Sequence, residues 1–188
     1  MSKPMILALA FATTALPCAA QTDDVNRTGA TGPAEIRVTG RVQGRADLKF
    51  FNDAAMGGLV EVRLGEVAQK QAASEDVRIL AQRLMDQHET VNEELKVLAD
   101  AKVVTFPAAL DKDHQELVDK LLPYTGPDFD REYLQLMTRH HEEQIELYER
   151  EAKRGDDPDL RAFAQRVLPD LHEHLRLIKQ TRENVGQK

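Results

Sequence analysis

Residues 101–127, AKVVTFPAALDKDHQELVDKLLPYTGP, decide the fold of this chain because they join two pairs of long helices. The segment starts as an extended piece interrupted by Pro107 and continues as a short predicted helix over about Asp111–Leu122. Pro123 and Gly126 then break the helical pattern. A link of this length can return along the side of a helix bundle, which a tight turn cannot do.

Long helical patterns lie on both sides of this link. Before it, apolar residues at helical spacing predict one helix over about Leu48–Ala73 and a second from the N-cap Ser74 to about Ala101. After it, the same spacing predicts a third helix over about Pro127–Lys153 and a fourth over about Pro158–Glu183. The turn inside each pair is short, so its two helices must be antiparallel neighbours.

The predicted fold class is therefore all-α: a ferritin-like four-helix bundle with one long crossover carrying a short extra helix. In this arrangement the second and third long helices run parallel. An up-and-down bundle with an extra short helix is the alternative, and it needs only a shorter second link. Aromatic residues make up 5% of the chain, and with only 10 Gly this argues against a β-sandwich or barrel.

The first 20 residues, MSKPMILALAFATTALPCAA, have the basic start, apolar stretch and small final residues of a secretory signal peptide. We expect cleavage after Ala20 and a periplasmic location. Cys18 is a poor lipidation site because Pro17 precedes it. The predicted division is a signal peptide at 1–20, a flexible linker at 21–47, the four-helix bundle at 48–183 and a C-terminal tail at 184–188.

Composition excludes several classes of partner and site. The 188 residues include 25 Lys plus Arg against 32 Asp plus Glu, a net charge of -7 that argues against nucleic-acid partners. After the signal peptide no apolar run is long enough for a membrane span. The single cysteine leaves with the signal peptide, so a metal site in the mature protein must use histidine, carboxylates or methionine.

Each long helix carries one titratable residue at the centre of its apolar face. These residues are Glu61, His88, His141 and His174. Counted from the helix starts, the first three lie at a similar depth, and His174 lies about one turn, roughly 5 Å, farther along. Asp170, one turn earlier on the same face, is nearly level with them.

Two interpretations of this polar layer remain open. In one, Glu61 pairs with the imidazoles and the metal-free layer fixes the helix register. In the other, Glu61, His88, His141 and His174 bind a metal, with Asp170 as a substitute ligand or a partner behind the ligands. This donor set suits a divalent transition-metal ion such as zinc, iron or copper. Because only a neutral imidazole binds metal, we expect affinity to fall below a pH of about 6.5.

Other polar residues fit a site less well. His140 lies at the edge of the apolar stripe, His172 on the polar face and His114 in the crossover. Asp130 is predicted to support a helix terminus rather than chemistry. Glycines near Glu61 predict a close helix approach: Gly57, Gly58 and Gly65.

Four stretches carry a family resemblance: GGLVEVRLGEVA, LAQRLMDQHETVNEELKVLA, FDREYLQLMTRHHEEQIELYEREA and DPDLRAFAQRVLPDLHEHLRL. Together they resemble a bacterial family of secreted domains of unknown function, often labelled as (outer) membrane proteins. The resemblance covers about Phe50–Ile178 and implies a ferritin-like fold and export. The family positions that carry over are Glu61, His88, His141 and His174. The resemblance supplies no activity, and nothing in the sequence beyond the signal peptide supports the membrane label.

No catalytic residue is assigned, because the sequence holds no nucleophile elbow, phosphate loop or dinucleotide fingerprint. The Glu-x-x-His pair of ferritin di-iron sites is absent from the core faces. The leading hypothesis is a periplasmic metal-binding or stress-related ferritin-like protein. A structural or interaction bundle with a metal-free layer is the alternative, followed by a mononuclear-metal oxidoreductase. The oligomeric state stays open.

Overall fold

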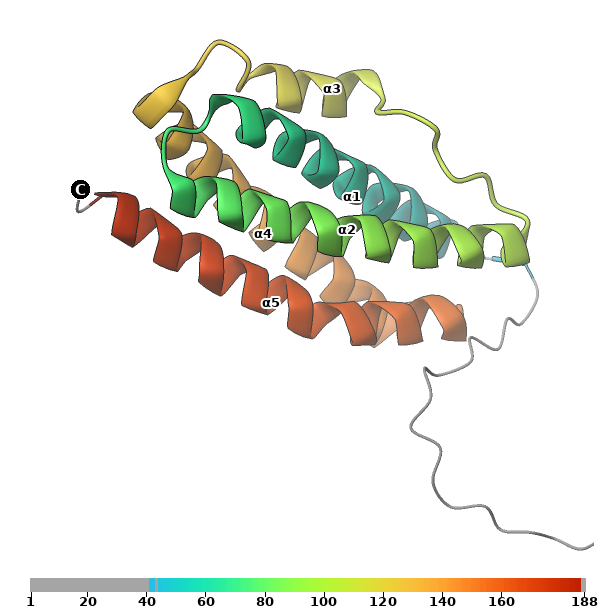
Figure 1. Ribbon diagram of the computed structural model, residues 1–188. Helices are drawn as coiled ribbons and strands as arrows, with labels where there is room; N and C mark the ends of the chain where they lie inside the picture. Colours follow the sequence, from blue (N-terminus) through green and yellow to red (C-terminus); the bar gives the residue numbers. More distant parts are fainter. Residues whose placement is uncertain (1–40, 43, 187–188) are drawn as a thin grey trace, which may run out of the picture. The chain divides into compact units, whose positions relative to one another are not determined.

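The computed structural model describes residues 41–42 and 44–186, and their long elements are helices. These elements are α1 (Arg45–Gln71), α2 (Glu75–Lys102), the short α3 (Lys112–Asp119), α4 (Gly126–Arg154) and α5 (Pro158–Gly186) (Figure 1). The predicted signal peptide, nearly all of the linker and the last two tail residues lie outside the described residues. Each long helix begins and ends within about three residues of its predicted bounds, and α1 starts earlier, at Arg45.

The two hairpins are joined by one long crossover, as predicted. The start of α4 lies beside the α1–α2 turn, since the backbone N–H groups of Ala73 and Ser74 both donate to Asp130. The end of α2 lies beside the start of α5, since Lys102 contacts Asp157 at 2.8 Å. α2 and α4 therefore run parallel. The crossover that joins them contains α3 and returns along the bundle (Figure 1). The fold is a ferritin-like four-helix bundle.

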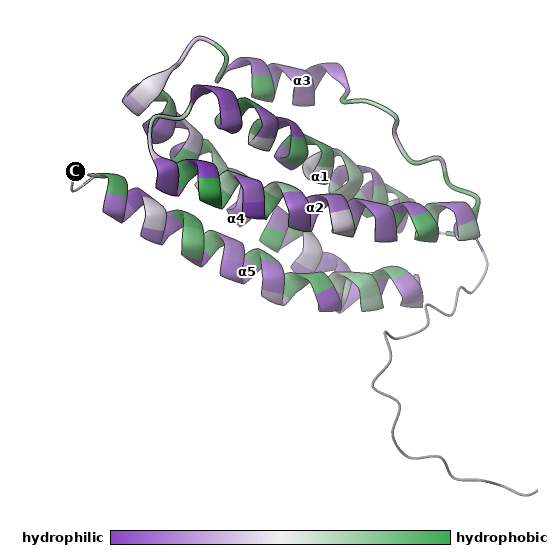
Figure 2. Ribbon diagram, viewed as in Figure 1, coloured by the Kyte–Doolittle hydropathy of each residue, from purple (hydrophilic) through white to green (hydrophobic). Residues whose placement is uncertain are grey.

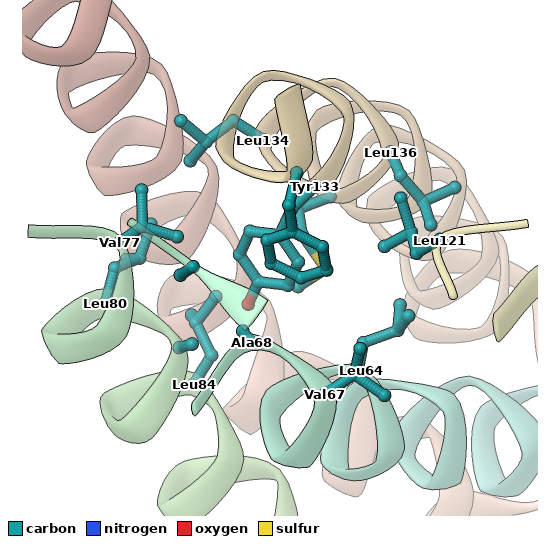
Figure 3. Close-up of a cluster of buried hydrophobic side chains, with 14 of the residues drawn as sticks. Leu64, Val67, Ala68, Val77, Leu80, Leu84, Leu121, Tyr133, Leu134 and Leu136 are labelled. Carbon is teal, nitrogen blue, oxygen red and sulfur yellow. The ribbon is translucent and has the colours of Figure 1, made fainter. Parts of the chain in front are cut away.

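Each helix buries one face, and Figure 2 shows hydrophilic and hydrophobic stretches alternating along the helices. The buried apolar side chains form two clusters. One lies toward the α1–α2 turn and includes Tyr133, Leu64 and Leu134 (Figure 3). The other contains Phe51, Leu95 and further residues toward the α4–α5 turn. The histidines of the predicted polar layer lie between these two clusters along α2, α4 and α5, and Glu61 on α1 follows Val60 at the edge of the first cluster.

The turns at the two ends of the bundle are held in the same way. Asp130 of α4 accepts from the turn of the first hairpin, at 3.1 and 2.8 Å. Asp47 of α1 accepts from the backbone N–H groups of Asp156 and Asp157 in the turn of the second, at 3.0 and 2.8 Å. Ser74 is the N-cap of α2, but its side chain makes no capping hydrogen bond. Asp130 accepts from the N–H groups of Ala73 and Ser74 just before α2, so it has a structural role, but at the α1–α2 turn rather than at the start of its own helix.

A second carboxylate near the α4–α5 turn has a strongly perturbed environment. Glu151 lines a groove of about 290 Å³ between the start of α1 and the end of α4. Its side chain is buried, and Oε1 lacks a hydrogen-bond partner within the described part of the chain. Burial, and then the charges of Asp47 and Asp157, raise the pKa of Glu151 to about 7.

We expect Glu151→Gln to raise the free energy of unfolding at pH 8 by about 1 to 2 kcal/mol, reduced from the full shift because the groove admits solvent. Between pH 4.5 and about 7 this carboxyl is protonated in the folded state and ionised in the unfolded state, so wild-type stability falls as the pH rises through that range. Denaturant titrations at pH 5 and pH 8 measure this, and the variant should show a shallower pH dependence. Glu149→Gln, at an exposed site, should not.

Candidate metal centre

The structure brings four predicted residues together in one buried layer. Glu61 of α1 lies with Oε1 3.2 Å from Nδ1 of His141 and Oε2 4.0 Å from Nε2 of His88. His141 in turn places Nε2 3.4 Å from Nδ1 of His174. All four residues are at most 5% exposed. One residue from each of four helices thus meets in this layer, including His174, which counting along its helix placed about one turn away.

Three of these residues form a cluster that could hold a metal ion. His88, His141 and His174 each offer one ligand atom, and these atoms lie within 4.8 Å of one another. Two nitrogen ligands of a tetrahedral ion with bonds of 2.0–2.1 Å are about 3.3–3.4 Å apart. The separation of 3.4 Å between the His141 and His174 nitrogens matches that spacing. Glu61 lies beside this group and contacts two of its imidazoles.

With the Gln87 amide oriented as in the structure, the hydrogen bonds of the layer indicate which ring nitrogens carry protons. Nδ1 of His141 lies 3.1 Å from the Met137 carbonyl, which can only accept, so Nδ1 is the donor. Nε2 of His174 lies 2.8 Å from Oε1 of Gln87 and is likewise the donor. The two remaining nitrogens, 3.4 Å apart, then face each other with lone pairs. Such a pair requires a cation between them, or a turned Gln87 amide that reverses the proton on His174.

Unpartnered polar atoms gather at this depth. The described residues contain eight buried side-chain nitrogen or oxygen atoms without a hydrogen bond. Four belong to the layer: both oxygens of Glu61, Nε2 of His88 and Nε2 of His140. Oδ1 of Asn92, one turn after His88, is a fifth. Buried polar groups are nearly always paired in native proteins, so this concentration indicates a ligand or a proton arrangement specific to the layer.

Burial also keeps the imidazoles neutral. It lowers the pKa of His140 and of His174 to about 4, and it lowers the pKa of His88 and His141 well below the usual value. Burial raises the pKa of Glu61 well above its usual value. In the folded protein the imidazoles are therefore ready to bind metal at pH values below 6.5. The sequence alone predicts that metal affinity falls below a pH of about 6.5, the usual pKa of histidine. Because burial lowers these pKa values, we instead expect the fall at a lower pH.

The structure adds His140, which the helical wheel placed at the edge of the stripe. Its side chain is buried, with Nε2 3.4 Å from Oε1 of Glu61. Asp170, in contrast, is exposed and lies outside the layer, although its charge partly offsets the burial that lowers the pKa of His174. His172 is exposed, as expected for the polar face.

Glycines admit the neighbouring helices beside Glu61. A Cβ on Gly58 would lie 1.9 Å from Oδ1 of Asn92, and one on Gly65 would lie 2.9 Å from Cβ of Met85. Both neighbours belong to α2, whereas a Cβ on Gly57 would lie 2.5 Å from Nε2 of Gln144 on α4. The predicted close approach is therefore one of α1 to both α2 and α4, and the approach to α2 sets the distance between Glu61 and His88.

Comparison with known protein families identifies the family of this chain. A model described as a domain of unknown function, DUF4142, matches residues 35–181. The chain belongs to the DUF4142 family. This DUF4142 match spans all five helices except for the last residues of α5. None of the helices in residues 44–186 is long and apolar enough to cross a membrane. Among curated proteins, none matches the chain.

Solved structures share the fold of this DUF4142 chain. One is CopM in a Cu(II)-bound form, at 18% identity and a TM-score of 0.62, covering 73% of this chain and 96% of that one. A DUF305 fragment from Deinococcus radiodurans aligns at 14% identity and a TM-score of 0.64, over 77% and 98% of the two chains. A DUF305 protein from Streptomyces coelicolor aligns at 18% identity and a TM-score of 0.64, over 75% and 94%. At these identities the likeness shows the helical fold.

Proposed function

We propose that this protein binds a transition-metal ion in the buried layer, with His88, His141 and His174 as ligands and Glu61 as the adjoining carboxylate. One observation carries the proposal: two buried imidazole nitrogens face each other at 3.4 Å while the second nitrogen of each ring is engaged elsewhere. A proton on either nitrogen would relieve the contact, but burial disfavours the charged imidazolium. A metal ion satisfies both lone pairs at once.

The donor set supports a divalent transition metal, and zinc, iron and copper are the candidates. For a given set of ligands, the affinity of divalent first-row metal ions is highest for Cu²⁺. The fold shared with CopM, solved with Cu(II) and with silver, adds support for copper. We further propose that the protein acts outside the cytoplasm, in the periplasm, after removal of the predicted signal peptide. A role in metal stress is the biological context that fits.

The metal content of untagged protein tests the proposal. Chelator-treated protein is mixed with excess Cu²⁺, desalted, and analysed for copper and protein. Wild type should retain copper, and His141→Ala should weaken binding by at least about 100-fold, because losing even a group behind the ligands costs 10- to 100-fold. His172→Ala, at an exposed site, is the matched control and should retain the ion.

The alternative is a metal-free polar layer that fixes the register of the helices, and the same experiment distinguishes it. Copper content unaffected by His141→Ala would favour this structural role. Loss of copper with His172→Ala alone would place the ion on the surface and contradict the buried site. Helical circular dichroism verifies that each variant is folded.

Asp170 has an outer role in this proposal. It is exposed beyond His174, so we place it behind the ligands, near the solvent side of the site. We expect Asp170→Asn to keep the full metal content at saturating copper and to weaken affinity by less than about 10-fold. Titration with Cu²⁺ against a competing chelator measures this. A loss of stoichiometric binding would instead make Asp170 a ligand.

A further inference from the structure

Glu61 faces a second, separate imidazole in addition to the three-histidine group. His140 lies on α4 with Nε2 3.4 Å from Oε1 of Glu61, and both side chains are at most 5% exposed. His140 is not one of the three residues whose ligand atoms lie within 4.8 Å of each other. Oε1 also lies 3.2 Å from Nδ1 of His141, so the Glu61 carboxylate lies between His140 and the three-histidine group.

The proton arrangement of His140 leaves its inner nitrogen as an acceptor. The ring hydrogen-bonds to the backbone of Gly57, and Nε2 lacks any hydrogen bond among the described residues. Nδ1 is thus the donor toward the Gly57 carbonyl, and Nε2 presents a lone pair toward Oε1 of Glu61, which carries only lone pairs when the carboxyl is ionised. Their separation of 3.4 Å is about that of two ligands of one tetrahedral ion.

The other oxygen of the same carboxylate faces the first group. Oε2 lies 4.0 Å from Nε2 of His88, a member of the three-histidine group. A carboxylate whose oxygens face two separate sets of donors is the usual bridge of two-metal sites, in which the ions lie about 3.5–4 Å apart. Near the same carboxylate, Tyr133 is fully buried with an unpartnered hydroxyl, which Figure 3 shows pointing into the bundle.

We infer that the layer holds two metal ions, the first on His88, His141 and His174 and the second on His140, with Glu61 bridging them. This inference rests on the proposed function. The second position has fewer protein ligands, so it binds more weakly and leaves coordination sites open to water or a small anion. The ligand class is a divalent ion that accepts imidazole and carboxylate, such as Cu²⁺ or Zn²⁺.

Stoichiometry tests the inference in a background variant, His114→Ala with His172→Ala, which removes the other two imidazoles of the chain. Loaded with Cu²⁺ and desalted, this background should retain two ions per chain. His140→Leu, which keeps an apolar side chain of similar size in the core, should retain one. His174→Leu should disturb the first position and leave at most one. His140→Gln is the second variant if the leucine substitution prevents folding.

Electron paramagnetic resonance supplies a second readout. Two Cu²⁺ ions joined by one carboxylate should be magnetically coupled. The background variant loaded with two ions per chain should therefore show a smaller signal than its copper content predicts. His140→Leu should show a full signal from one isolated ion. A single ion in the background variant, unchanged by His140→Leu, would overturn the two-ion inference and leave the proposed function intact. No retained ion in any form would instead overturn the proposed function.

Discussion

Replacing Glu61 by leucine is expected to remove metal binding and, at the same time, to stabilise the metal-free protein by about 1 to 4 kcal/mol. The side chain is buried, and neither oxygen makes a hydrogen bond. Burial raises the pKa of Glu61, so in the absence of a cation the carboxyl is held in an environment that disfavours its charge. Leucine fills a similar volume without that cost, and His141 keeps its hydrogen bond to the Met137 carbonyl.

Two measurements check this prediction: denaturant unfolding of chelator-treated protein at pH 7, and copper retention after desalting. Glu66→Leu is the matched control, because Glu66 lies on the same helix in an exposed pair with Arg63. It should change neither quantity appreciably. If Glu61→Leu destabilises the metal-free protein by several kcal/mol, then the carboxyl is a satisfied part of a structural polar layer. If Glu61→Leu instead raises stability and lowers copper retention, the residue is kept for binding at a cost in stability.

The topology and most of the layer could be predicted from the sequence because both depend on helix periodicity. The length of residues 101–127 decides that α2 and α4 are parallel, and Figure 1 agrees. The wheel placed Glu61, His88 and His141 at one depth for the same reason: a straight helix converts residue number into height.

His174 shows where counting residues fails. It lies about one turn beyond the level of the others when counted from the start of α5. Its Nδ1 nevertheless lies 3.4 Å from Nε2 of His141. Side chains in a helix tilt toward its N-terminus, so those of the antiparallel α4 and α5 tilt in opposite directions. That tilt moves the two imidazoles together and leaves Asp170, the residue at the counted level, exposed.

His140 was missed because the wheel considers one helix at a time. Its position at the edge of the α4 stripe is buried by α1, whose Gly57 backbone accepts a hydrogen bond from the ring. A glycine in the facing helix lets an imidazole at a stripe edge reach a main-chain carbonyl. The sequence offered two signals: adjacent histidines, His140–His141, and adjacent glycines, Gly57–Gly58. They predict a contact only when it is known that α4 and α1 face each other.

The end turns give a prediction about folding that is independent of the metal. We expect Asp47→Ala and Asp130→Ala each to lower the free energy of unfolding by about 2 to 3 kcal/mol, because each carboxylate accepts two backbone N–H groups of a turn. Both side chains are buried, so water cannot replace the lost acceptor. Denaturant unfolding measures the loss. Asp128→Ala and Asp53→Ala, at exposed sites on the same two helices, are the controls and should change stability by less than about 0.5 kcal/mol.

The double variant Asp47→Ala with Asp130→Ala has the largest expected effect on stability. Asp47 and Asp130 lie at opposite ends of the bundle and share no partner, so their effects should add to about 4 to 6 kcal/mol. Each aspartate belongs to one hairpin and holds the turn of the other, which makes the pairing of the hairpins reciprocal. Arg78 and Arg161 add a matching contact within each hairpin by donating to the turn carbonyls beside them, Ala72 at 2.5 Å in the first turn and Asp156 at 3.0 Å in the second. A loss well below the sum would mean that the hairpins are held mainly by the two apolar clusters. Copper retention should survive each single change, since the metal layer lies midway between the two turns.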